Sequence, residues 1–303
     1  MIYTVTLNPS VDYIVEVNDF QTGHLHRMKR EEKFPGGKGI NVSRVLTRMN
    51  VPTKALGFIG GFTGDYIKET LQEEGTSSAF ISVEGDSRIN IKLKSGQETE
   101  INGDGPSITE FHIKKLFQQL EAVEEGSIVV VGGSIPSSLP RNLYEMIVRT
   151  CSQKGIRVVV DASGEALRQA ILAQPFLIKP NQYELEELFE TKIHTLEEAI
   201  PFGRKLVEMG AQHVIVSMGA LGAALCTDNR VYIAHVPPGD VINSIGAGDS
   251  LVAGFIGTYW RTNDKEEAFK IGVATGSATA FSHDLCTVEH VQQLVGKVHI
   301  REI

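Results

Sequence analysis

The chain has 303 residues and a net charge of −8, and 42% of its residues are hydrophobic while 22% are charged. This composition is ordinary for a globular protein with a large core, and the negative charge argues against a nucleic-acid partner that needs a basic face. No apolar run approaches the ~18 residues of a membrane span, and the first residues indicate a strand rather than a leader. The three cysteines are scattered, which predicts reduced thiols. A cytoplasmic protein is therefore expected.

Strands and helices alternate along most of the chain. The predicted elements are a strand at 2–7, a helix ending at 49, a strand at 53–59, helices near 64–74 and 109–121, a strand at 127–131, a helix at 140–154, and strands at 156–160, 176–179 and 214–217. A further helix begins at 196 with the capping box Thr195 and Glu198, and the chain after Asp249 is predicted to be mostly helical to about residue 295. Alternation of this kind predicts an α/β fold, a doubly wound and mainly parallel sheet with helices on both faces.

Residues 11–20 and 88–102 interrupt this rhythm. Both segments alternate polar and apolar side chains, as strands with one solvated face do. They predict a small β lobe built from about 11–34 and 84–104, within a single domain spanning 1–303. A one-sided β lobe must cover an active site, a second subunit, or both.

The stretch from Asn243 to Ser250 is the strongest candidate for chemistry. Gly246, Ala247 and Gly248 precede Asp249, and an apolar helical run follows. Small residues let a ligand approach the first free amides of a helix, where the helix dipole favours an anion. Asp249 could take a proton from a nearby hydroxyl, so anion site and base together indicate phosphoryl transfer. The structural alternative is a glycine-rich turn with a carboxylate that interacts with the dipole.

Several polar residues follow predicted parallel strands, whose carboxyl ends form the ligand edge of such sheets. These residues are Asp12, Ser134, Asp161, Lys179, Asn181 and Ser217, and Gly219 belongs to the same turn as Ser217. Each taken alone could also be a turn or cap residue.

Other polar groups could hold substrate. The turn containing Gly37, Lys38 and Asn41 fits neither a P-loop nor a dinucleotide fingerprint. Arg88, Asn90 and Lys92 share one face of a strand, which suits a sugar phosphate or a solvated edge. Asn181 and Glu184 form either a capping box or an oxygen-rich corner for Mg²⁺.

With these residues identified, the chain resembles the ribokinase/PfkB family of carbohydrate kinases over its full length. The resemblance depends on the early segment Gly36–Arg44, the late segment Gly246–Ser250 and the Asn181–Glu184 element, in matching order and separation. It implies a ribokinase-like fold with a small β-sheet lid that often forms a dimer interface, and it implies ATP and Mg²⁺. A homodimer through the lid is therefore expected.

Within the family, the resemblance is strongest to the branch that converts fructose 1-phosphate into fructose 1,6-bisphosphate. This resemblance depends on the segments Thr4–Asp12, Arg88–Lys94 and Gly96–Asn102. At the position where many relatives have Asp-Thr, this chain has Asn243-Ser244. A tagatose-6-phosphate kinase is the alternative. The intact Gly246–Asp249 segment argues against a sugar-phosphate sensor that has lost catalysis. The missing dinucleotide fingerprint argues against a dehydrogenase.

The resemblance also implies residue roles. Asp249 would be the base, with the amides of Gly246, Ala247 and Gly248 as the anion site. Sugar hydroxyls would contact Asp12, Gly37 and Asn41. The substrate phosphate or adjoining oxygens would contact Lys38, Arg88, Asn90, Ser134 and Arg27. The nucleotide and Mg²⁺ would contact Lys179, Asn181, Glu184 (the metal through water), Ser217, Gly219, Gly222 and Gly248.

Overall fold

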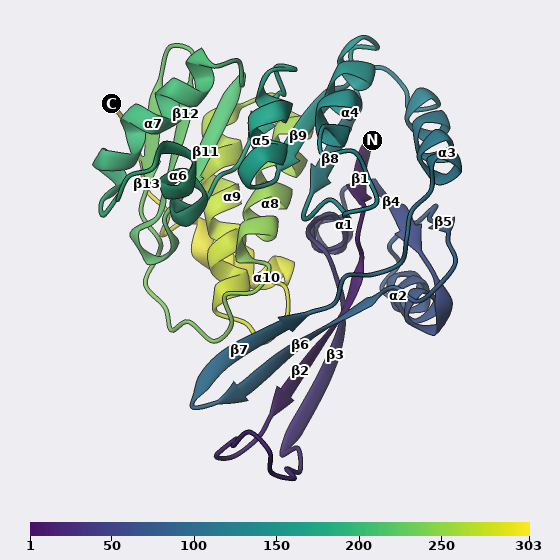
Figure 1. Cartoon of the computed structure of the whole chain (residues 1–303). Helices are drawn as coiled ribbons and strands as arrows, with labels where there is room; N and C mark the ends of the chain where they lie inside the picture. The colour runs from purple at the N-terminus through teal and green to yellow at the C-terminus, as the bar shows by residue number, and fades with distance from the viewer.

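A ten-stranded sheet runs through the body of the protein (Figure 1). The computed structural model describes all 303 residues. The strands lie across this main sheet in the order β14 (Ile300–Glu302), β13 (Val231–Ala234), β12 (Ala223–Thr227), β11 (His213–Ser217), β10 (Leu177–Ile178), β9 (Arg157–Asp161), β8 (Ile128–Gly132), β1 (Ile2–Thr6), β4 (Thr53–Ile59) and β5 (Ile81–Ser82). The strands from β11 to β5 are all parallel, which confirms the predicted mainly parallel sheet.

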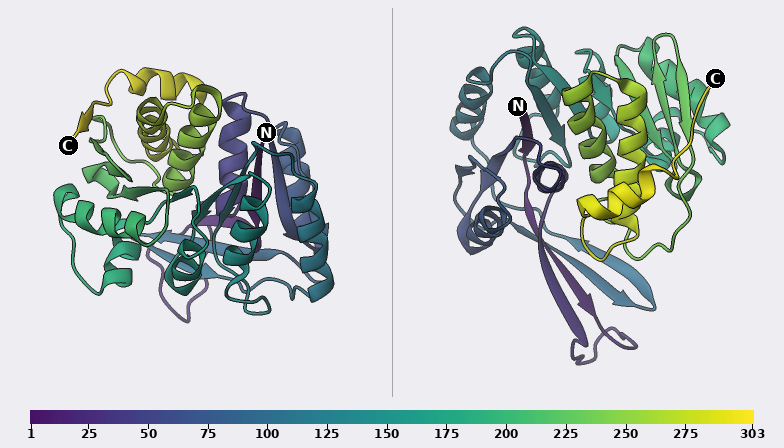
Figure 2. Two further views of the ribbon diagram at one scale, coloured as in Figure 1. Left: turned by 90° about the horizontal axis from the view of Figure 1, so that it is seen from above. Right: turned by 180° about the vertical axis from the view of Figure 1, so that it is seen from behind.

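Helices cover both faces of the main sheet, as doubly wound topology requires (Figure 2). One face packs against α3 (Glu110–Glu121), α4 (Leu143–Ser152), α5 (Gly164–Ile171), α6 (Gln182–Phe189) and α7 (Leu196–Glu208). The other packs against α1 (Lys38–Arg48), α8 (Ala247–Thr262), α9 (Lys265–Ala280) and α10 (Val288–Val295). The strands between the two layers are almost continuously apolar because both of their faces are buried.

A separate small sheet projects from the main body (Figures 1 and 2). Its strands lie in the order β3 (Arg30–Gly36), β2 (Ser10–Glu16), β6 (Arg88–Ser95) and β7 (Gln97–Asn102). β2 and β6 are parallel, and the two outer strands run antiparallel to their neighbours. Val11 at its base packs against Ile67 and Leu71 of α2 (Gly61–Glu73), which anchors the small sheet to the main body.

Several predicted elements need correction. Residues 88–102 form two strands with a turn at Gly96, and the strand predicted over 11–20 ends at Glu16. The antiparallel hairpin of β12 and β13 was not predicted, because buried strands lack the alternation that marks a half-exposed hairpin. The predicted helices after Asp249 are confirmed as α8, α9 and α10. No helix is long and apolar enough to cross a membrane.

Candidate active site

The carboxyl ends of the central parallel strands bring most of the predicted residues to one edge of the main sheet. Gly132 at the end of β8 lies in register with Asp161 at the end of β9. Lys179 directly follows β10, and Asn181 forms a bridge with Ser217 at the end of β11. This is the edge at which parallel α/β sheets bind ligands.

The N-terminus of α8 points into this edge with Asp249 in its first turn. Gly246 precedes the helix with a φ of 74°, a conformation that glycine adopts without strain. A Cβ atom at Gly246 would lie 2.6 Å from Cδ2 of Leu285, so the position also has no room for a side chain. Asp249 is 8% exposed, and Nδ2 of Asn41 from α1 donates to its Oδ2 atom at 2.8 Å.

The backbone amides of this turn differ in what they offer an anion. The Ala247 amide donates to the carbonyl of Ser244 at 3.2 Å, so it does not belong with the free donors that the sequence predicted. The amides of Gly246 and Gly248 donate to no backbone carbonyl, because they precede the first repeating helical hydrogen bond. The free anion donors at this turn therefore include Gly246 and Gly248.

Two lysines pair with the buried carboxylate of Asp161 and form a charged cluster beside this turn. Nζ of Lys38 lies 2.7 Å from Oδ1 of Asp161, and Nζ of Lys179 lies 3.3 Å from Oδ2. Burial alone would raise the pKa of Asp161, but the ammonium groups of Lys179 and Lys38 hold that pKa below its usual range. Nζ of Lys179 lies close to Gly248, because a Cβ atom added at Gly248 would be 3.2 Å from it. The cluster therefore places positive charge beside the glycine amides.

Asp249 has an unusual proton affinity for a carboxylate. Burial, and then the negative charge of Asp161, raise the pKa of Asp249 to about 6, and Lys38, Asn41 and Lys179 only partly offset this. A base is most effective when its pKa lies near the working pH. The turn therefore joins an anion site to a carboxylate suited to accept a proton.

Asn181 and Glu184 form the capping box of α6 and also reach the cluster. Oε2 of Glu184 accepts from the Asn181 amide at 2.8 Å, and Oε1 lies 3.7 Å from Nζ of Lys38. The protein has no group of three or more His, Cys, Asp or Glu side chains arranged to hold a metal. The Mg²⁺ ion that the family resemblance implies would need only one or two carboxylates, because phosphates and water complete its shell. Glu184 fits that requirement, whereas both oxygens of Asp161 are paired with Lys38 and Lys179.

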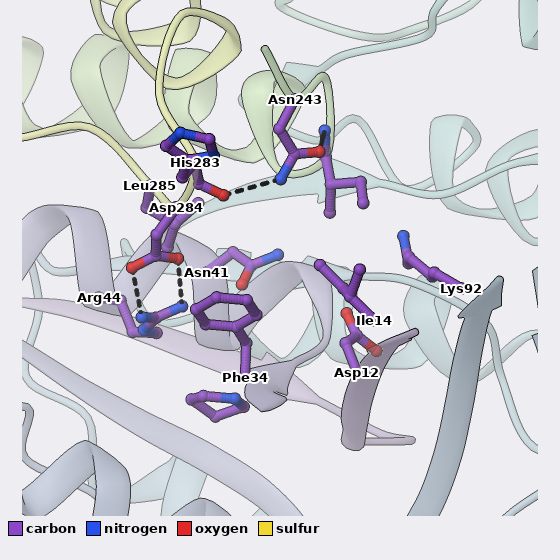
Figure 3. A pocket seen from close by; sticks show the side chains of 12 residues that line it. Asp12, Ile14, Phe34, Asn41, Arg44, Lys92, Asn243, His283, Asp284 and Leu285 are labelled. Carbon is purple, nitrogen blue, oxygen red and sulfur yellow. Dashed lines mark hydrogen bonds and ion pairs between the residues drawn. The ribbon is translucent and has the colours of Figure 1, made fainter. Parts of the chain in front are cut away.

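A pocket lies between this edge and the inner face of the small sheet (Figure 3). Its walls include Asp12, Phe34, Asn41, Lys92, Asn243 and Asp284. Asp12, within β2, accepts hydrogen bonds from Ser10 Oγ at 2.8 Å and from Asn90 Nδ2 at 3.0 Å. Polar groups of the small sheet thus face Asn41, the partner of Asp249, across one cavity.

Other predicted residues lie outside this pocket. Arg88 belongs to the same face of β6, but its Nε donates to the Asn8 carbonyl at 3.1 Å. Arg27 is exposed in the loop 17–29, at the end of the small sheet farthest from the main sheet (Figure 1). Ser134 is exposed after β8, and the turn after β11 contains Gly219 and Gly222.

One group near the pocket was missed by the sequence argument. Arg44 of α1 donates to Glu74 at 2.7 and 2.6 Å and to Asp284 at 3.3 and 2.9 Å. Asp284 belongs to the loop whose Leu285 packs against Gly246 and whose His283 carbonyl accepts from Asn243. This network ties α1 to the loops around the Asp249 turn, and its partners are too distant in the chain for a local motif to reveal it.

Known proteins share this sequence and architecture. The pattern of the pfkB family of carbohydrate kinases matches residues 5–290. The 1-phosphofructokinase of Bacillus subtilis (strain 168) is 57% identical over 303 residues, 100% of each chain. A tagatose-6-phosphate kinase of Staphylococcus epidermidis (strain RP62A) is 34% identical over 291 residues, 92% of each chain. The tetrameric inhibited form of phosphofructokinase-2 from Escherichia coli has a TM-score of 0.90 and 29% identity, and the match covers 97% of this chain and 98% of that one.

Proposed function

Because the chain belongs to the pfkB family of carbohydrate kinases, we propose that it transfers the γ-phosphoryl group of ATP to the 6-hydroxyl of fructose 1-phosphate, giving fructose 1,6-bisphosphate. The relatives that match this chain over its full length are phosphosugar kinases, and so is this protein. The observation that carries the finer proposal is the buried carboxylate of Asp249, held by Asn41 beside the free amides at the start of α8. The name of the Bacillus subtilis relative supports the choice of sugar.

In this proposal, Asp249 accepts the proton of the attacking hydroxyl as the new O–P bond forms. Asn41 fixes the orientation of the carboxylate through the 2.8 Å hydrogen bond. The raised pKa of Asp249 makes it a stronger base than an exposed carboxylate while leaving it mostly ionised at neutral pH. Little covalent work remains for the protein, so its main task is to position the two substrates.

The transferring phosphoryl group gains negative charge on its oxygens, and the chain offers positive groups at that place. The amides of Gly246 and Gly248 and the dipole of α8 would stabilise this charge. Lys38 and Lys179, held in place by Asp161, add two ammonium groups nearby. Mg²⁺, held by Glu184 through water, would neutralise charge on the ATP phosphates.

The two substrates would approach the Asp249 turn from different elements. Sugar hydroxyls would bond to Asp12, Asn41 and Asn90, with Gly37 leaving space beside them. The nucleotide would lie along the ends of β10 and β11, where Asn181 and Ser217 are adjacent. The glycines of the following turn, Gly219 and Gly222, would leave its backbone open to the nucleotide.

Tagatose 6-phosphate is the second candidate substrate, because a tagatose-6-phosphate kinase is also a full-length relative. The test is a comparison of fructose 1-phosphate, fructose 6-phosphate, tagatose 6-phosphate and unphosphorylated fructose in one assay of ATP-dependent ADP release. We expect the highest kcat/KM with fructose 1-phosphate and a product phosphorylated at both ends by ³¹P NMR. A higher kcat/KM with tagatose 6-phosphate would replace the proposed substrate. No ADP release with any sugar phosphate would contradict the proposed activity.

We also propose that the small sheet acts as a lid and that its outer face forms a homodimer interface. Ile89 and Ile101 lie on the face opposite Asn90 and are 40% and 56% exposed, so this face presents two large apolar side chains that a second copy of the chain would cover. The E. coli relative is described as tetrameric in its inhibited form. Light scattering should give twice the chain mass for the wild type and a smaller mass for Ile101→Asp. A wild-type monomer at micromolar concentration would contradict this proposal.

A further inference from the structure

Two cationic side chains line the pocket between the main and small sheets, and they differ in what they can offer a ligand. Arg44 is almost fully buried and directs its donors to Glu74 and to Asp284. Figure 3 shows its contact with Asp284. Two carboxylates therefore already neutralise this guanidinium. A ligand phosphate would have to displace one of them, so Arg44 is poorly suited to bind it.

Lys92 is the second cation, and its charge is less firmly paired. Its side chain is 10% exposed and lies beside Asp12 and Ile14 in Figure 3. The carboxylate in contact with it is Glu100 on β7, at 3.3 Å, and the Glu100 side chain is 49% exposed. An ion pair with one solvated partner is weak, so Lys92 can exchange Glu100 for a better anion in the pocket.

The strand register places Lys92 at a useful distance from the sugar-binding groups. Asn90 is paired with Asp12 and Lys92 with Ile14, so all four positions face the same side of the small sheet. Two residues along a strand correspond to about 6.6 Å. If the hydroxyls of a sugar bond to Asp12 and Asn90, Lys92 therefore lies one side-chain repeat beyond them, toward the tip of the small sheet.

Arg88 lies one repeat from Asn90 in the opposite direction. Its guanidinium donates to the Asn8 carbonyl, and it is not among the residues that line the pocket. Burial lowers the pKa of Arg88, and no carboxylate forms a salt bridge with it. Arg88, one of the positions expected from sequence to hold the phosphate, is thus partly committed to the backbone, whereas Lys92 faces the cavity.

We propose that Lys92 is a specificity-determining residue that binds the phosphate already present on the sugar substrate. This inference rests on the proposed function, since it names the group that recognises the phosphate of that substrate. A phosphomonoester dianion accepts charge-assisted hydrogen bonds from an ammonium group and outcompetes the solvated carboxylate of Glu100. Lys92 thereby makes the enzyme favour a ketohexose monophosphate over the free ketohexose.

The test compares Lys92→Met with Lys94→Met. Methionine keeps an apolar stem of similar length and removes the charge. Lys94 lies on the same strand and face, but it is 38% exposed and pairs with Glu98 at 3.7 Å, so it is a matched control. KM and kcat are measured for fructose 1-phosphate, unphosphorylated fructose and ATP, and the thermal midpoint of each variant checks that it folds.

We expect Lys92→Met to raise KM for fructose 1-phosphate by about 10- to 100-fold, the effect of losing a charge-assisted hydrogen bond. KM for ATP and kcat/KM for fructose should stay within about two-fold, and Lys92→Arg should restore part of the loss. Lys94→Met should match the wild type.

Three outcomes would overturn the inference: an unchanged KM for fructose 1-phosphate in Lys92→Met, equal losses with fructose and fructose 1-phosphate, or a larger phosphate-specific loss in Arg88→Met than in Lys92→Met. A wild-type enzyme without activity on fructose 1-phosphate would instead contradict the proposed function. Activity of the wild type together with an unaffected Lys92→Met would contradict only the role of Lys92.

Discussion

The edge of the main sheet and the small sheet use ion pairs of nearly equal length in different ways. Lys38 and Asp161 lie 2.7 Å apart, and their side chains are 32% and 3% exposed. Glu16 at the end of β2 and Lys29 just before β3 lie 2.8 Å apart, and their side chains are 37% and 61% exposed. Solvent therefore screens the second pair more strongly than the first, in which the carboxylate is buried. Distance alone therefore does not identify the charges that matter for catalysis.

This difference suits the tasks proposed above for the two regions. The main-sheet edge must hold charge at fixed positions while a phosphoryl group moves, which favours buried groups with fixed partners. The small sheet must admit and release a charged sugar, which favours pairs that exchange partners easily. Lys92 combines the two conditions, because it is buried while its partner Glu100 is not.

The largest effect is expected at the main-sheet edge, from Asp249→Asn. The amide keeps the shape of the side chain but cannot accept the proton, so kcat should fall by roughly 10²–10⁴-fold. The dissociation constant for ATP, measured by calorimetry, should change little. Turnover within a few-fold of the wild type would show that another group accepts the proton.

Removing one partner from each kind of ion pair tests the comparison directly. Lys179→Met leaves the buried Asp161 with one lysine fewer, and the free energy of unfolding should fall by roughly 3 kcal/mol. Lys29→Met in the small sheet should not shift the urea midpoint measurably. Equal midpoint shifts in the two variants would mean that burial does not distinguish the two regions.

A smaller effect is expected on the pH dependence of kcat/KM. Asp249 must be deprotonated to act as a base, so kcat/KM of the wild type should fall as the pH drops through about 6. Asp161→Asn removes the negative charge that helps to raise the pKa of Asp249, so the acidic limb should move to lower pH. A limb that stays in place, or moves to higher pH, would contradict the electrostatic link between the two carboxylates.

The sequence predicted features that depend on neighbouring residues. The turn before Asp249 is recognisable because its glycines, carboxylate and apolar helix are consecutive, and the small sheet because its strands alternate. The parallel order of the main sheet then indicated which strand ends meet. Resemblance to a family extended this reading to ATP and a phosphosugar.

Features that depend on distant pairs could not be predicted in this way. Lys38 and Asp161 are 123 residues apart, and Arg44 and Asp284 are 240 apart, so no local pattern links them. The hydrogen bond from the Ala247 amide to the Ser244 carbonyl depends on the conformation of the turn. Small residues allow such a turn several conformations, so the sequence does not specify this bond. The position of Lys92 in the pocket required the register of β2 against β6.

The most direct test of the central claim is a crystal structure of the protein with fructose 1-phosphate and a non-hydrolysable ATP analogue. We expect the 6-hydroxyl to lie about 2.6–3.2 Å from the Asp249 carboxylate, in line with the γ-phosphate, which contacts the amides of Gly246 and Gly248. A 6-hydroxyl that contacts no carboxylate, with the γ-phosphate away from these amides, would contradict it.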